Sequence, residues 1–163
     1  MTSSAYFMIF PALMAFAASY DACALRIMNG LCILLACAFM PAAFLAGLTV
    51  EAALLHAGCG LAALVFGFML FANGWMGGGD AKLFAAAALW FGWDRIADFA
   101  VATALAGGVL AMALLAARMF AMQFFPARAP ARLVNAEMPY GVALACGALL
   151  VFPHSVWAMG IAA

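Results

Sequence analysis

The sequence predicts an all-α polytopic membrane protein, a bundle of about six transmembrane helices. Of its 163 residues, 72% are hydrophobic and only 7% are charged, whereas charged residues make up about 25% of a soluble domain. Such a composition cannot supply the polar exterior that a soluble domain of this size needs. The apolar residues also fall into runs separated by short polar turns. The length accommodates about six spans of roughly 20 residues each.

Six apolar runs account for almost the whole chain. They cover residues 5–20, 30–50, 52–72, 81–93, 99–117 and 138–163. We therefore expect residues 1–163 to form a single transmembrane domain with no separate soluble domain. The first run is expected to be a permanent span rather than a cleaved signal, because no basic residue precedes Arg26.

The fourth run is short for a membrane span. As a helix it covers roughly 20 Å, whereas the hydrocarbon core is about 30 Å thick. We expect the helix to continue past Asp94. We also expect Asp80 to lie below the membrane surface. The next turn is predicted at Asp94, Arg95 and Asp98.

The basic residues gather on one side of the predicted membrane. With six spans, one side receives Arg26, Lys82, Arg118, Arg128 and Arg132, and the other receives only Arg95. The positive-inside rule makes the first side cytoplasmic, so that both termini face outward. The net charge of zero argues against a nucleic-acid partner.

The cysteines and histidines give no sign of a metal site. The five cysteines form no C-x-x-C pair, and most lie inside apolar runs, where cysteine behaves as a small buried hydrophobe. We therefore expect neither a metal nor a disulfide. His56 and His154 are expected to be packed or interfacial side chains.

Two acidic residues stand at the predicted cytoplasmic ends of spans. Asp21 ends the first span and Asp80 opens the fourth. Ionisable groups at a membrane boundary are costly, which makes them functional candidates. Two carboxylates held close together can share one proton, so that the ionised one accepts a proton from water and the protonated one polarises a carbonyl group. This aspartic-peptidase chemistry needs no cofactor, and we expect none.

The spacing of the two aspartates also suits other functions. Aspartates at helix ends often cap helices, and carboxylates inside membranes carry protons in transporters. The alternatives are therefore a small proton or solute transporter or channel using Asp21 and Asp80, and an assembly subunit whose aspartates only cap helices.

Three blocks of the sequence resemble the prepilin peptidases, the aspartic leader peptidases of type IV pilus and secretion systems. The blocks follow the family's order and span most of the chain: Asp21 with Arg26-Ile27-Met28-Asn29 is similar to D-x(n)-R-I-P-N, Gly77-Gly78-Gly79-Asp80-Ala81-Lys82-Leu83 to G-x-G-D-x-K-L, and Pro139-Tyr140-Gly141 to the start of P-Y-G-x-A.

The resemblance implies that Asp21 and Asp80 are the catalytic pair of an aspartic endopeptidase. The enzyme would lie in a bacterial inner membrane with its active site facing the cytoplasm. It would cleave the leader of a prepilin or pseudopilin, itself a single hydrophobic helix with a short basic leader. The sequence does not indicate which pilin is cleaved, nor the oligomeric state.

The resemblance also implies supporting roles for nearby residues. Glycines before Asp80 would allow another chain to approach closely. Arg26 and Lys82 would hold the orientation at the membrane surface or attract an acidic substrate or lipid headgroups, and they serve equally well as positive-inside anchors. The full supporting set is Gly77, Gly78, Gly79, Lys82, Arg26 and Asn29, with Pro139, Tyr140 and Gly141 as a possible substrate or active-site motif.

The chain departs from the family pattern in two respects. Met28 stands where proline is usual. Longer members carry a cytoplasmic segment with paired C-x-x-C motifs and also methylate the new N-terminus, and this chain has no such insert. It resembles the short members associated with tight-adherence (Flp-type) pili, which implies peptidase activity without methyltransferase activity. Presenilin and signal-peptide-peptidase relatives share G-x-G-D, but their last motif is P-A-L.

Overall fold

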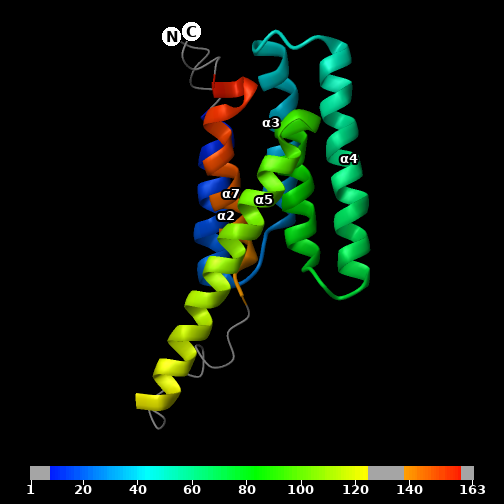
Figure 1. The fold of residues 1–163 in the computed structure, drawn as a ribbon. Helices are drawn as coiled ribbons and strands as arrows, with labels where there is room; N and C mark the ends of the chain where they lie inside the picture. The colour runs from blue at the N-terminus through cyan, green and yellow to red at the C-terminus, as the bar shows by residue number, and fades with distance from the viewer. Residues whose placement is uncertain (1–7, 125–137, 159–163) are drawn as a thin grey trace.

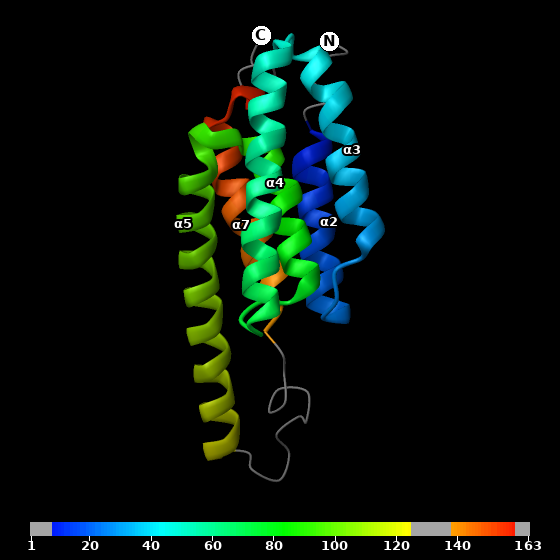
Figure 2. The ribbon, with the colours of Figure 1, turned by 90° about the vertical axis from the view of Figure 1, so that its right-hand side faces the viewer.

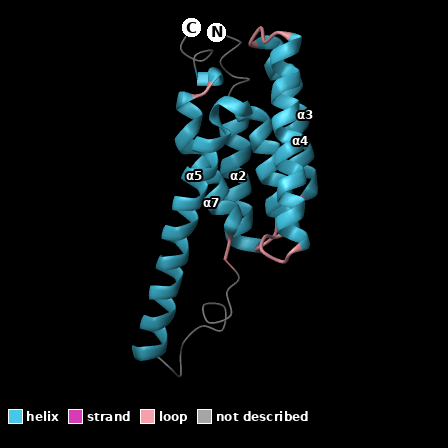
Figure 3. Cartoon of the chain, turned by 45° about the vertical axis from the view of Figure 1, so that its right-hand side comes forward, coloured by secondary structure: helices cyan, strands magenta, loops and turns pink. Residues whose placement is uncertain are grey.

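Helices form all the regular structure in the computed structural model, which describes residues 8–124 and 138–158 (Figure 3). Successive helices run in opposite directions along the bundle (Figure 1). In chain order they are α2 (Ile9–Ala24), α3 (Asn29–Leu45), α4 (Val50–Ala72), α5 (Gly78–Phe124), α7 (Tyr140–Val151) and the short 3-10 helix η1 (Phe152–His154).

The outer surface of the bundle is apolar. Large side chains such as Leu54, Leu61 and Leu105 are 64–66% exposed. The helices α4 and α5 are each long and apolar enough to cross a bilayer. A contiguous apolar exterior of this extent requires a lipid environment. The predicted all-α membrane bundle is therefore confirmed. Arg128 and Arg132, which the sequence analysis assigns to the cytoplasmic side, lie outside the described residues.

Helix α5 consists of two helices that meet at a sharp break. At Gly92 the backbone has φ 62° and ψ −172°, a conformation that is essentially restricted to glycine. The chain reverses there, so that the first half of α5 (residues 78–91) and the second half (residues 93–124) run in opposite directions (Figures 1 and 2). With α2, α3, α4 and α7, the described part of the chain thus contains six helical segments besides η1.

The break overturns the predicted turn at Asp94. The fourth helix does not continue past Asp94 but ends at Gly92, and Asp94, Arg95 and Asp98 lie within the second half of α5. One glycine is enough to reverse the chain, so no polar turn is needed. Asp94 and Asp98 lie in the first turns of the second half of α5, where acidic side chains interact favourably with the helix dipole. Arg95 also forms an exposed ion pair with Asp98 at 3.0 Å.

Side chains from other helices satisfy the carbonyl groups that the break exposes. A helix end leaves its last carbonyl groups without helical partners. The ring N–H at Nδ1 of His56 donates to the Leu89 carbonyl at 2.9 Å, and the indole N–H of Trp157 donates to the Trp90 carbonyl. His56 thus has a structural role at the break.

Replacing Gly92 by alanine is expected to destabilise the fold. The added Cβ would lie 2.8 Å from the His56 ring, and the positive φ strains any L-residue. We expect a loss of at least about 2 kcal/mol in the free energy of unfolding, seen as a lower unfolding temperature in detergent. Gly108→Ala is the matched control, because nothing lies within 4 Å of its Cβ position. Equal unfolding temperatures for the two variants would contradict this account.

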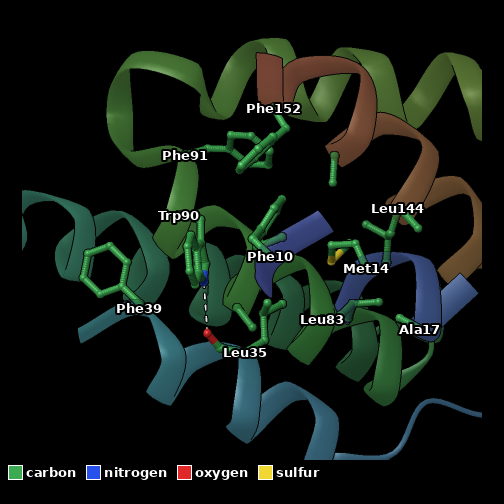
Figure 4. Packing of buried hydrophobic residues seen from close by; sticks show 14 of the residues in the cluster. Phe10, Met14, Ala17, Leu35, Phe39, Leu83, Trp90, Phe91, Leu144 and Phe152 are labelled. Atoms are coloured by element: carbon green, nitrogen blue, oxygen red, sulfur yellow. Dashed lines mark hydrogen bonds between the residues drawn. The ribbon is translucent and has the colours of Figure 1, made fainter. Parts of the chain in front are cut away.

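The core is formed by aromatic and small side chains around the first half of α5. Phe10 lies against Trp90, with ring centroids 5.1 Å apart, and the Trp90 indole N–H donates to the Leu35 carbonyl at 2.9 Å (Figure 4). Small residues bring α4 close to α5, since a Cβ on Gly67 would lie 3.0 Å from that of Ala81. The first half of α5 is thereby fixed at the centre, with Asp80 at its beginning.

Candidate active site

Asp21 and Asp80 lie at the same end of the bundle, which we call the carboxylate end. Helix α2 runs toward this end and Asp21 is in its last turn, whereas α5 starts there and Asp80 is in its first turn (Figure 1). Both side chains line one cavity of about 310 Å³. The two carboxylates are close enough for their charges to interact.

The carboxylate of Asp21 is buried and held by the start of α7. Asp21 is only 4% exposed, and the backbone N–H of Gly141 donates to its Oδ2 at 2.8 Å. The free N–H groups at a helix start form a natural site for an anion. A Cβ on Gly141 would lie 2.8 Å from the same oxygen. Only glycine therefore lets α7 approach Asp21 this closely.

Asp80 is partly buried, and its side chain folds back over the glycine-rich turn. A Cβ on Gly77 would lie 2.6 Å from Oδ2 of Asp80, and one on Gly79 would lie 3.1 Å from Cβ of Ile27. The first contact makes room for the carboxylate, and the second lets the segment after α2 lie against the start of α5. Gly78 faces elsewhere, and a Cβ on it would lie 3.2 Å from the Phe71 ring.

The chain turns sharply just after Asp21. Leu25 adopts the left-handed conformation, with φ 52° and ψ 36°, and its N–H donates to the Asp21 carbonyl at 2.8 Å. This conformation is uncommon for residues other than glycine. The turn places Leu25, Arg26 and Ile27 along the wall of the cavity. This role of Leu25 is not evident from the sequence, because a left-handed helix end usually carries glycine or asparagine.

The predicted supporting residues divide into two groups. The first group lines the carboxylate cavity and consists of Arg26, Gly77, Gly79 and Tyr140. Met138, which is not among the predicted residues, lines the same cavity. Pro139 directly precedes α7.

Lys82 and Asn29 do not line that cavity. The Lys82 ammonium group donates to Oδ1 of Asn29 at 2.9 Å, and both side chains line a neighbouring apolar cavity instead.

A polar cavity with two carboxylates, at one end of an all-helical membrane bundle, defines a class of protein that can perform acid–base chemistry at a membrane boundary. The chain belongs to the type IV leader peptidase family, whose family model matches residues 8–112. The match includes both aspartates and the glycine turn, whereas α7 lies beyond it. No curated protein and no solved structure matches the chain. The resemblance to prepilin peptidases is thus confirmed, and the chain is a membrane peptidase of the family that acts on prepilins.

Proposed function

We propose that this chain is an aspartic endopeptidase that removes the leader from a prepilin or pseudopilin, with Asp21 and Asp80 as its catalytic pair. The observation that carries the proposal is the shared cavity, in which buried Asp21, held by Gly141, faces the same space as Asp80. We assign the activity to residues 1–163 as a single domain.

The chemistry is a direct hydrolysis. The ionised carboxylate accepts a proton from a water molecule as the water oxygen adds to the scissile carbonyl carbon. The protonated carboxyl group donates a hydrogen bond to the carbonyl oxygen, which stabilises the charge that develops there. The proton then passes to the leaving nitrogen and the C–N bond breaks. The products are a leader with a new carboxyl group and a pilin with a new amino group.

The distribution of charge supports a cytoplasmic active site in a bacterial inner membrane. Arg26 and Lys82 are exposed at the carboxylate end. Arg118 lies in the last two turns of α5, and the second half of this helix extends beyond the carboxylate end (Figure 2). Arg95 follows the break at the opposite end. By the positive-inside rule, the end with more basic residues faces the cytoplasm.

Cleavage is tested with purified protein in liposomes and a tight-adherence-type prepilin. We expect a gel shift to the mature size, and the same prepilin should be cut by inside-out vesicles but not when supplied outside intact spheroplasts. An absence of cleavage by the wild-type chain with several prepilins, together with proton flux in the same liposomes, would favour the transporter alternative.

We expect the mature pilin to carry an unmethylated N-terminus. The chain lacks paired C-x-x-C motifs, which in the longer family members accompany methylation. Mass spectrometry of pilin processed in the presence of S-adenosylmethionine should therefore show cleavage without a methyl increment. A longer family member that carries the C-x-x-C segment is the positive control, and a methylated product from this chain would contradict the assignment to the short subgroup.

A further inference from the structure

An apolar groove runs along the bundle between α3 and α4. Both helices pack against α5 but hardly touch each other. Two cavities, of about 590 and 460 Å³, lie in the space between them. The cavities share Ala36, Ala57 and Leu89 in their walls, so they form one continuous groove with the first half of α5 as its floor.

The groove covers most of the depth of a membrane. Along α3 its lining runs from Asn29 to Phe44, which corresponds to about 23 Å of helix. The hydrocarbon core is about 30 Å thick. A lipid acyl chain covers only one leaflet, about half of that depth, whereas a transmembrane helix fills all of it.

The lining of the groove suits a helix. At its middle and floor the side chains are small, with Ala36, Ala57, Gly60, Ala85 and Ala86. Small residues let the backbones of two membrane helices approach closely. The remaining lining is apolar, with Cys32 and Met40 among it, apart from the hydrogen-bonded pair of Lys82 and Asn29 at one end.

The polar end of the groove adjoins the carboxylate cavity. Lys82 follows Asp80 by two residues, and Asn29 follows Ile27, a wall of the carboxylate cavity, by two residues. An apolar helix in the groove therefore has to end level with Asp80. The peptide that continues from this helix would pass around the start of α5 to reach the carboxylate cavity, because the groove and the cavity lie on different sides of that helix.

We propose that the groove between α3 and α4 binds the apolar helix of the prepilin substrate and so presents its scissile bond to the two carboxylates. This inference rests on the proposed function. Docking along the groove restricts the position and tilt of the substrate before the reaction, which lowers the entropic part of the barrier.

Photo-crosslinking tests this placement. The photoreactive residue p-benzoylphenylalanine is introduced at Leu61 or Leu54 in the groove, or at Leu105 on the second half of α5 as the control, in a chain that also carries Asp80→Asn. These three leucines are 64–66% exposed, and Leu105 lines neither groove cavity. With co-expressed prepilin, we expect prepilin adducts at Leu61 and Leu54 and none at Leu105. Equal adducts at all three sites, adducts only between two copies of the chain, or adducts only with lipid would overturn the proposal.

A second measurement fills the groove. Ala57→Trp is expected to raise KM for full-length prepilin at least about tenfold with kcat retained, whereas Ala104→Trp on the exposed face of α5 should leave both unchanged. An unchanged KM for Ala57→Trp would overturn the proposal. If Ala57→Trp fails to fold, the crosslinks decide. If the wild-type chain cleaves prepilin but no adducts form in the groove, only the proposed docking site is refuted. If the wild-type chain does not cleave prepilin, the proposed function is refuted.

Discussion

Asp21→Asn and Asp80→Asn should each lower the cleavage rate of prepilin by about 10²–10⁴-fold, the contribution typical of acid–base catalysis. Asparagine fills nearly the same space as aspartate but can neither accept the proton from water nor donate one to the leaving nitrogen. The rate is measured from the appearance of mature pilin on gels, with the amount of membrane-inserted variant determined in the same samples.

Asp94→Asn is the matched control for the two carboxylates. Asp94 is exposed at the opposite end of the bundle from Asp80, just after the break at Gly92. Its substitution should leave the rate unchanged. Asparagine also caps helices well. Full activity in Asp21→Asn or Asp80→Asn would therefore assign that aspartate to helix capping and refute its catalytic role.

Gly141→Ala should reduce kcat by about 10²-fold, because displacing a reacting group by about 1 Å can cost that much. The added Cβ would lie 2.8 Å from Oδ2 and 3.0 Å from Cγ of Asp21. The carboxylate must then move away, or α7 must retreat and lose the hydrogen bond from Gly141. The kinetic constants are measured with purified variant and full-length prepilin.

Gly30→Ala serves as the control for Gly141→Ala. Gly30 lies in the first turn of α3, at the same end of the bundle, and nothing lies within 4 Å of its Cβ position. Its kcat should equal that of the wild type. A Gly141→Ala variant with normal kcat would show that the contact between α7 and Asp21 does not position the carboxylate for catalysis.

The sequence alone predicts that Asp21 and Asp80 lie at the same end of the bundle. Alternating spans place the end of the first and the start of the fourth on one side, so the two aspartates share an end in any six-helix bundle. The turn at Leu25 and the reversal at Gly92 could not be predicted from the sequence. A single residue with positive φ leaves little trace in an apolar run, and the His56 and Trp157 side chains that satisfy the carbonyl groups at the break come from distant segments.

Lys82 illustrates why a motif does not define a cavity. It stands two residues after Asp80, and on a helix with 3.6 residues per turn these side chains are about 200° apart around the axis. Asp80 therefore faces the carboxylate cavity, while Lys82 faces the groove between α3 and α4. The proposed catalytic and supporting residues of one sequence block thus lie on two different surfaces of the same helix.

The early reversal at Gly92 has a consequence for the surrounding bilayer. The first half of α5 covers only about 21 Å, against about 34 Å for the 23 residues of α4. The reversal consequently lies lower in the bundle than the turn between α3 and α4 (Figures 1 and 2). The exposed Asp94 and Asp98 that follow it require water or headgroups at that depth. The leaflet at this end of the bundle has to be drawn inward, and the protein should favour membranes whose lipids tolerate such local thinning.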